Sequence, residues 1–221
     1  MSKIKFSVNA VIFDMDGVIT NTMPYHFKAW KKIFHEAGVE VSHHSVYIRE
    51  GQRGLWSVKE IFEEKGRPYQ EKEAKRLLKK KEELFKKIVK SRFIQGSRSF
   101  LKDLHRKGIR LALVTGTARH EVHKILPEVI YDLFEVVVTG SDVHHGKPHP
   151  EPFELALKQL ALRPQEAVVI ENAPLGIQSA RAAGLRCLAL ATSLPASYLK
   201  KANHIFVSMK ELQEKTQWVK K

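Results

Sequence analysis

The feature that most constrains the fold is a pair of aspartates, Asp14 and Asp16, which follow the largely apolar run 8–12. This run is short and rich in branched side chains, which is typical of a buried strand in a parallel sheet. Gly17 comes next and allows the backbone to turn away from the sheet. In open α/β sheets, ligands bind outside the carboxyl ends of the strands. Because adjacent carboxylates repel, this pair indicates a bound cation or a shared proton.

Each of three later apolar runs also ends in polar residues. The runs cover residues 111–114, 135–138 and 167–170. The first and third runs lead directly into Thr115-Gly116-Thr117 and Glu171-Asn172, and the second leads, after a loop, to Gly146-Lys147-Pro148. A lone pair of aspartates is common in surface turns, but four strands that bring acids, a hydroxyl, an amine and an amide to one sheet edge predict a functional site.

After residue 96 the chain alternates between helical and strand-like patterns. The expected helices are 97–107, 119–126, 151–160 and 175–183, and the last expected strands are 186–191 and 204–207. Such alternation predicts an α/β fold with a doubly wound parallel, Rossmann-like sheet.

A mostly helical insert is expected between the first strand, which we place up to Asp16, and the strand that begins near Arg110. Its expected helices are 24–37, 56–65 and 70–90, and Trp30 and Trp56 are expected to pack inside it. The prediction is therefore a core of residues 1–19 and 92–221 and an inserted helical unit of residues 20–91.

Much of the formal net charge of +14 lies in the segment 71–92. Apolar residues recur there at helical spacing, which predicts an amphipathic helix with a solvated, lysine-rich face. A field that attracts phosphorylated small molecules is a second interpretation, and a nucleic-acid surface is not favoured because no binding motif accompanies the charge. Cys187 is the one cysteine, and no apolar run has membrane-spanning length, so we expect a cytoplasmic monomer without a membrane partner.

The order of these motifs resembles the haloacid dehalogenase-like (HAD) hydrolase superfamily. The segments 13–22 and 25–30 are most similar to its β-phosphoglucomutase-like branch, and the segments 146–152 and 176–184 fit the same branch. The resemblance covers nearly the whole chain, and it is weakest in the insert and at the last residues. It implies that the insert is a cap that closes over the active site and that Mg²⁺ is the cofactor.

The resemblance and the chemistry of phosphoryl transfer together suggest a role for each catalytic candidate. Asp14 would be the nucleophile and form an aspartyl-phosphate. Asp16 would protonate the leaving oxygen and later activate water. Thr115 and the backbone amides of the next two residues would hold the phosphoryl group. Lys147 would place a positive charge beside the phosphate and Asp14.

The expected metal ligands are Asp14, the backbone carbonyl of Asp16 and a group from Glu171-Asn172. The resemblance implies an acid pair at the last position, whose second acid binds the metal, but this chain has Asn172 there. Asn172 could bind Mg²⁺ more weakly through its carbonyl oxygen, Glu171 could replace it directly or through water, or Asn172 could only cap the following helix. The histidines within 144–149 are expected to face solvent rather than bind a transition metal.

Further substrate-binding candidates come from the resemblance. His26 matches a cap residue that contacts the catalytic acid, and the alternative is an ordinary helix histidine. Thr22 matches the hinge, and the alternative is an N-cap for the helix at Pro24. Lys81 matches a basic cap position, and Arg119 replaces a polar amide of the mutase.

The segment 49–54 decides which substrate we expect. Gly51 fits the mutase pattern, but Glu50 stands where the mutase has a lysine and Gly54 where it has an arginine. Arg53 is one position early and could reach the same phosphate. An acid beside a phosphate site lowers affinity. The prediction is therefore a Mg²⁺-dependent phosphatase for a small phosphorylated, sugar phosphate-like metabolite, with β-phosphoglucomutase as the alternative and a non-catalytic phosphate- or nucleic-acid-binding protein as a lesser one.

Overall fold

The computed structural model describes residues 3–221, and its centre is a six-stranded parallel sheet. The strands are β2 (Ala10–Phe13), β3 (Arg110–Val114), β4 (Val136–Val138), β5 (Ala167–Glu171), β6 (Arg186–Leu190) and β7 (His204–Phe206). Their spatial order is β4-β3-β2-β5-β6-β7. The strand order reverses at β2, which lies between β3 and β5, so the residues after β2 lie at a switch point. The predicted parallel α/β sheet is confirmed.

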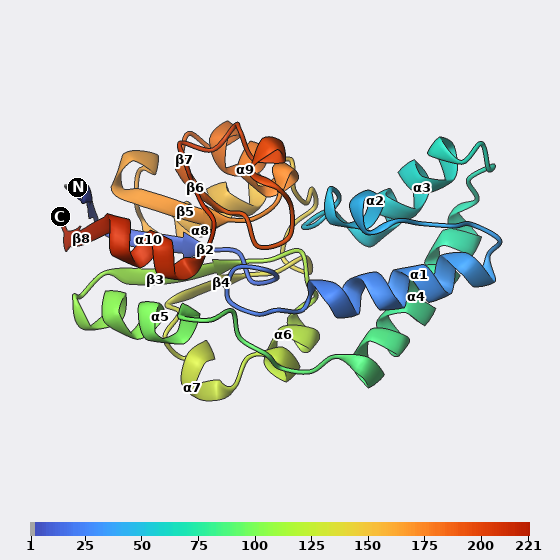
Figure 1. Ribbon diagram of the computed structural model, residues 1–221, viewed down its shortest axis with the longest axis horizontal. Helices are drawn as coiled ribbons and strands as arrows, with labels where there is room; N and C mark the ends of the chain where they lie inside the picture. Colours follow the sequence, from blue (N-terminus) through green and yellow to red (C-terminus); the bar gives the residue numbers. More distant parts are fainter. Residues whose placement is uncertain (1–2) are drawn as a thin grey trace.

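Helices cover both faces of this sheet (Figure 1). Successive residues of β2 alternate between the faces, so Val11 and Phe13 pack in one apolar cluster and Ala10 and Ile12 in another. Helices α5 (Ser97–Arg106), α6 (Arg119–Ile125), α7 (Glu128–Tyr131) and α10 (Met209–Lys215) contribute to the first cluster. Helices α8 (Glu151–Leu160) and α9 (Pro174–Ala182) contribute to the second. Short 3₁₀ helices cover Pro164–Glu166 and Ala196–Tyr198.

A second, two-stranded sheet joins the two ends of the chain, and the sequence did not predict it. Strand β1 (Ile4–Val8) pairs in parallel with β8 (Thr216–Lys220), and the rings of Phe6 and Trp218 stack at 4.7 Å. The expected strand 8–12 is therefore wrong at its start, because Val8 ends β1 and the amide of Asn9 donates to the carbonyl of Glu166. The expected end at Asp16 is also wrong, since β2 ends at Phe13. Helices α7 and α10 were not predicted either.

The first four of the five helices between β2 and β3 form the cap, as we call residues 20–91. They are α1 (Met23–Glu36), α2 (His43–Tyr47), α3 (Gly54–Glu64) and α4 (Glu71–Ile88), of which α2 was not predicted. They share an apolar cluster of their own and lie at the end of the molecule away from both termini (Figure 1). The proposed boundaries of the two units stay a prediction.

The two tryptophans of the cap differ in burial. Trp30 is buried as predicted, but 55% of Trp56 is exposed, so that expectation is wrong. The buried stripe of α3 contains Val58 and Ile61, and Trp56 lies off it, with the Lys59 ammonium 5.3 Å from its ring centre.

The two connections between cap and core run side by side. Thr20 and Phe93 form an antiparallel bridge, and the amide of Asn21 donates to the carbonyl of Arg92 at 2.7 Å. This places the hinge of the cap directly after the residues that follow β2. Within residues 3–221, no helix combines the length and apolar character needed to cross a membrane.

Candidate active site

Three predicted residues from three segments meet at the carboxyl edge of the sheet. The ammonium Nζ of Lys147 donates to Asp14 Oδ1 and to Glu171 Oε1, each at 2.6 Å, and to the carbonyl of Val114 at 3.1 Å. All three N–H bonds of this lysine are thus used. Lys147, Asp14 and Glu171 are almost completely buried, so the lysine fixes the two carboxylates in a site protected from water.

Charge is not balanced in this buried group. Burial raises the pKa of Asp14 to about 8; the charges of Glu171 and Asp16 add to this effect, and the charge of Lys147 opposes it. Burial alone would lower the pKa of Lys147, but the two carboxylates raise it. Asp14, Asp16 and Glu171 together need more positive charge than one lysine supplies. A divalent cation or a retained proton would restore the balance.

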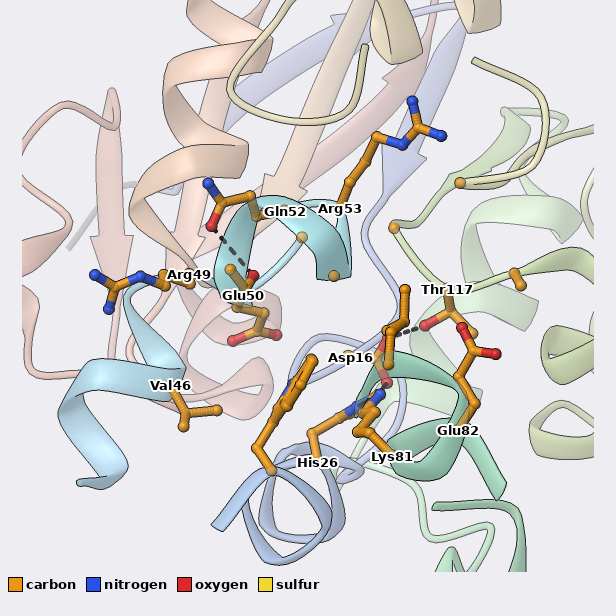
Figure 2. A pocket seen from close by; sticks show the side chains of 18 of the residues that line it. Asp16, His26, Val46, Arg49, Glu50, Gln52, Arg53, Lys81, Glu82 and Thr117 are labelled. Atoms are coloured by element: carbon orange, nitrogen blue, oxygen red, sulfur yellow. Dashed lines mark hydrogen bonds and ion pairs between the residues drawn. The ribbon is translucent and has the colours of Figure 1, made fainter. Parts of the chain in front are cut away.

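The second aspartate is held by residues from both cap and core. Asp16 accepts hydrogen bonds from the hydroxyls of Thr22 and Thr117, the latter at 2.9 Å, and its Oδ1 lies 3.3 Å from Nε2 of His26 (Figure 2). The other ring nitrogen of His26 lies 3.0 Å from Nζ of Lys81. Although burial opposes it, the charge of His26 and these hydrogen bonds lower the pKa of Asp16 to about 2. Asp16 is therefore held as a carboxylate.

A cavity of about 220 Å³ lies between the core residues of this site and the cap (Figure 2). Its lining combines Asp14, Asp16 and Gly116 from the core with Trp30, Gly51 and Lys81 from the cap.

At the mouth of this cavity the backbones of cap and core touch. A Cβ on Gly116 would lie 2.8 Å from the carbonyl oxygen of Gly51, and a Cβ on Gly51, whose φ is +81°, would lie 2.8 Å from Cδ of Lys147. Only glycine permits this approach and this backbone conformation. The segment 48–53, which we call the cap loop, thus packs directly against Gly116 and Lys147 of the core.

The remaining predicted residues differ in their access to the cavity. Arg53 lines it, with its guanidinium donating to the carbonyl of His144. Thr115 is buried and accepts a hydrogen bond from the amide of Thr117 at 3.1 Å. Thr22 occupies the N-cap position of α1, but its hydroxyl bonds to Asp16 instead of capping the helix.

Arg119 does not line the cavity, contrary to its predicted substrate contact. Its guanidinium donates to Asp142 at 2.6 Å and to the carbonyl of Val137 at 3.0 Å. The reason is local: Asp142 also accepts from the amide and hydroxyl of Thr139 at the end of β4, so the arginine braces that loop.

The two residues of the acid–amide pair after β5 have different hydrogen-bond partners. Glu171 uses both oxygens, because Oε1 accepts from Lys147 and Oε2 accepts from the amides of Asn172 and Ala173 at 2.8 and 3.1 Å. Helix α9 begins after Ala173 without a side-chain cap, so Asn172 is not the cap that one alternative proposed. The amide nitrogen of Asn172 donates instead to Glu50 at 2.9 Å and to Ser193 at 2.8 Å.

Several buried side-chain oxygens near the sheet edge have no hydrogen-bond partner. Among residues 3–221, the buried side-chain atoms without a hydrogen-bond partner are Asp14 Oδ2, Glu50 Oε2, Asn172 Oδ1 and, on helix α6 of the core, Glu121 Oε1. Buried polar atoms are nearly always paired. Carboxylate and amide oxygens are also the ligands that Mg²⁺ prefers, so these residues fit a divalent cation.

Glu50 is the residue that the sequence interpretation placed least well. It was expected only as an acid that weakens phosphate binding, yet it is buried and bonded to Asn172. Burial raises the pKa of its carboxyl well above the ordinary value, and the charge of Asp14 adds to this effect. The sequence did contain a signal for the pairing of Glu50 with Asn172. The chain departs from the family pattern twice, with an acid gained at Glu50 and an acid lost at Asn172.

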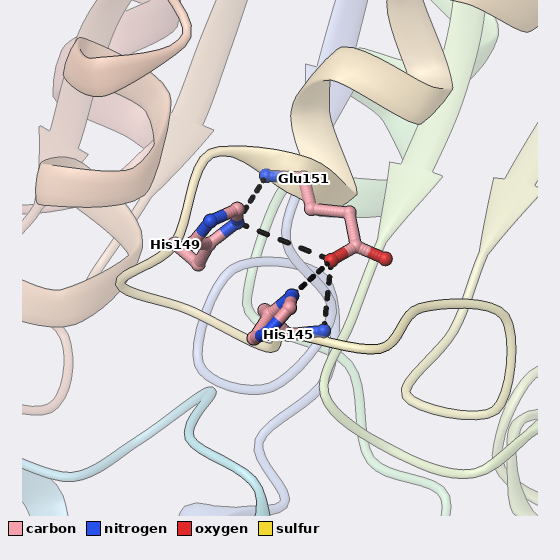
Figure 3. A group of neighbouring side chains, drawn as sticks. All are labelled: His145, His149 and Glu151. Carbon is pink, nitrogen blue, oxygen red and sulfur yellow. Dashed lines mark hydrogen bonds and ion pairs between the residues drawn. The ribbon is translucent and has the colours of Figure 1, made fainter.

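The loop that carries Lys147 is braced by Glu151 (Figure 3). This carboxylate accepts hydrogen bonds from the amides of His144 and His145 at 2.6 and 2.8 Å, and Nδ1 of His145 lies 2.9 Å from it. These bonds lower the pKa of Glu151 to about 2. The rings of His145 and His149 are exposed, as predicted.

Comparison with known proteins decides the family. The family model of haloacid dehalogenase-like hydrolases matches residues 11–190. The chain belongs to this family. It is 33% identical over 182 residues to the phosphorylated carbohydrates phosphatase of Thermotoga maritima, which covers 80% of this chain and 82% of that protein. It is 29% identical over 207 residues to the β-phosphoglucomutase of Bacillus subtilis, covering 85% of each chain.

Solved structures agree with this assignment. The β-phosphoglucomutase of Clostridium difficile superposes with a TM-score of 0.82 at 29% identity, over 94% of this chain and 96% of that chain. The predicted resemblance is therefore confirmed, and this HAD protein is an enzyme of the phosphatase and phosphomutase class. Enzymes of this kind generally use a divalent metal.

Proposed function

We propose that this enzyme is a Mg²⁺-dependent phosphatase that hydrolyses a small, sugar phosphate-like metabolite through an aspartyl-phosphate at Asp14. The observation that carries the proposal is the fixed Asp14–Lys147–Glu171 group beside a small cavity that also contains Asp16. Phosphoryl transfer needs a nucleophile, a positive charge and a proton acceptor, and Asp14, Lys147 and Asp16 would supply them in that order.

The metal would be held by Asp14, Asn172 and the backbone carbonyl of Asp16. The unpartnered oxygens of the first two support this assignment, and Glu171 is not needed as a ligand because its oxygens are occupied. A bound Mg²⁺ would neutralise charge on the phosphoryl oxygens and on Asp14.

The chain's own residues would carry the two half-reactions. In the first, an oxygen of Asp14 bonds to phosphorus, the phosphorus–ester bond breaks, and the leaving oxygen takes the bonding electron pair. The proton for this oxygen would come from Asp16, which must first take one up because it is ionised in the arrangement described above. In the second, water attacks the same phosphorus, gives its proton to Asp16, and the carboxylate of Asp14 leaves. Lys147 neutralises Asp14 throughout, and Thr115 with the amide of Gly116 would bind the phosphoryl oxygens.

A mutase must also bind a second phosphate, and the cavity offers little free positive charge for it. Arg49 is engaged by Glu60 and Glu64, and Arg53 by the carbonyl of His144. Glu50, Glu82 and Glu121 add acid to the lining. The position of Lys81 at the cavity supports β-phosphoglucomutase as the second candidate.

One assay separates the candidates. The purified protein is incubated with Mg²⁺ and β-glucose 1-phosphate, primed with the 1,6-bisphosphate, while glucose 6-phosphate and free phosphate are followed together. We expect phosphate release without isomerisation, either from β-glucose 1-phosphate or from another sugar phosphate in a panel of such esters. Glucose 6-phosphate that outpaces phosphate would make the enzyme a mutase. If no ester of the panel yields glucose 6-phosphate or free phosphate, the result would favour a non-catalytic phosphate-binding protein. If the protein binds nucleic acid and Asp14→Asn leaves that binding unchanged, the result would favour a nucleic-acid-binding protein.

A further inference from the structure

Two departures from the family pattern meet in space. The position that the resemblance predicts to be an acid is Asn172, and the position that it predicts to be a lysine is Glu50. They lie 122 residues apart in the chain, on the sheet edge and on the cap loop, yet their side chains are joined by a hydrogen bond. One carboxylate is thus missing from the sheet edge, and one is supplied from the cap.

This hydrogen bond fixes the orientation of the amide. The nitrogen of Asn172 donates to Oε1 of Glu50 at 2.9 Å. The hydroxyl of Ser193 lies on the same nitrogen at 2.8 Å. The carbonyl oxygen of Asn172 is therefore turned the other way, where it has no hydrogen-bond partner.

Three oxygens from three segments are left unpaired in this region of the structure. They are Oδ2 of Asp14, Oε2 of Glu50 and Oδ1 of Asn172, and the side chains are at least nine-tenths buried, with exposed fractions of 3%, 7% and 0%. Burial of an unpaired carboxylate oxygen is costly. Two carboxylates and one amide carbonyl form a ligand set of formal charge −2. The family pattern would supply the same charge through the nucleophile at position 14 and an acid at position 172.

We propose that Glu50 is a metal ligand that completes, with Asp14 and Asn172, the divalent cation site and thereby links the cap loop to the sheet edge. This inference rests on the proposed metal dependence of the enzyme and adds a residue from the cap to the site.

The cap loop is built to hold Glu50 in place. The neighbouring Arg49 donates to Glu60 at 3.0 Å and to the carbonyl of Ser45 at 2.6 Å, and also pairs with Glu64, so that α2 and α3 fix the loop. Figure 2 shows the Arg49 guanidinium pointing away from the Glu50 carboxylate.

Metal binding and cap closure are then thermodynamically coupled. Glu50 lies on the same loop as Gly51, which packs against Gly116 of the core. A cation that contacts both sides binds the closed form more tightly, and by linkage closure raises the affinity for the cation.

The test measures Mn²⁺ binding to the full chain by electron paramagnetic resonance and calorimetry, with Mg²⁺ as competitor. Glu50→Gln keeps the volume and an acceptor for Asn172 but removes the charge, and we expect it to weaken Mn²⁺ binding at least about 10-fold. The double variant Glu50→Gln with Asn172→Asp returns the carboxylate to the sheet edge and should recover most of that affinity. Glu82→Gln, which removes an acid from the same cavity lining, is the matched control and should bind Mn²⁺ as the wild type does.

Thermal unfolding separates a ligand from a structural role. Without metal, Glu50→Gln should unfold at the wild-type temperature or above it, because it removes repulsion with Asp14. With Mn²⁺, its melting temperature should rise less than that of the wild type. A loss of stability without metal, together with wild-type Mn²⁺ affinity, would overturn the proposal.

The coupling has its own readout. Small-angle scattering should show that Mn²⁺ makes the wild type more compact and that Glu50→Gln responds less. Wild-type Mn²⁺ affinity and compaction in Glu50→Gln, with metal-dependent turnover intact, would overturn the role of Glu50 alone. A wild-type protein that binds no divalent cation would overturn the metal-dependent function as well.

Discussion

The sheet edge and the cap loop contribute to the same site by different physical means. At the sheet edge, Lys147 and Glu171 have every polar side-chain atom paired. The cap loop contributes the glycine backbone at Gly51 and the half-paired carboxylate of Glu50. The proposed reacting groups therefore belong to a rigid frame, and the cap loop would complete the site from the other side.

The backbone explains this difference. The amide of Asp14 donates to the carbonyl of Ile170, and that of Thr115 to Val138, so the sheet ladder continues into the site. The cap loop is held by the side chain of Arg49 instead. Changes at the sheet edge should therefore affect turnover and stability, whereas changes in the cap loop should affect binding.

The largest effect is expected at the nucleophile. Asp14→Asn keeps the shape of the site but removes the attacking carboxylate, so turnover should fall by about 10⁴-fold or more. The protein should remain folded, because the variant removes a carboxyl group that is costly to ionise in its buried position, as its raised pKa indicates. The measurement is phosphate release, with melting temperature as the control for folding. Phosphate release at the wild-type rate would show that Asp14 is not the nucleophile.

The next effect tests the rigidity of the sheet edge. Lys147→Met leaves two buried carboxylates without their cation and should destabilise the fold by about 3–5 kcal/mol. The matched control is Lys75→Met, which breaks an exposed ion pair with Glu71 on α4 and should change stability very little. Denaturant unfolding of both variants gives the comparison. Equal losses would mean that the buried group is not what holds this edge together.

The sequence predicted the sheet edge well because local signals determine it. Apolar runs that end in Asp14, Thr115 and Glu171 mark strand ends, and parallel strands must bring such ends together. The segment 8–12 was misread because Val8 pairs with Lys220 at the other end of the chain. No local pattern reports a pairing between the two termini.

The cap loop could be predicted only in part. Gly51 was recognised from the family pattern, but the placement of Glu50 depends on a hydrogen bond to a residue of the sheet. The position of Arg119 has a related cause, since its guanidinium pairs with Asp142 outside the cavity lining. Charged side chains of this kind are positioned by tertiary partners that a single sequence does not reveal.

A smaller effect should separate the cap from the sheet edge. Gly116→Ala would place a Cβ 2.8 Å from the carbonyl oxygen of Gly51 and push the cap loop outward. A displacement of about 1 Å can lower kcat/KM by up to about 10²-fold, and we expect the melting temperature to change little because both units remain packed. Kinetics with a sugar phosphate and thermal unfolding check this. Unchanged kcat/KM would show that contact between the two glycines is not needed for turnover.

The smallest effect concerns the brace of the Lys147 loop, which is part of neither the sheet nor the cap. The pKa of Glu151 is lowered from 4.5 to about 2, chiefly by the amide of His144 and also by His145. A carboxyl whose pKa is lower in the folded state stabilises the fold above pH 4.5, and this contribution disappears as the pH falls toward 2. Glu151→Gln should therefore melt below the wild type at pH 7, and the difference should shrink between pH 5 and pH 3. Glu154→Gln, in the first turn of the same helix, controls for the loss of a charge near the helix N-terminus. A difference that stays constant with pH would show that these hydrogen bonds do not depend on the charge of Glu151, and the loop that presents Lys147 would then be held by packing alone.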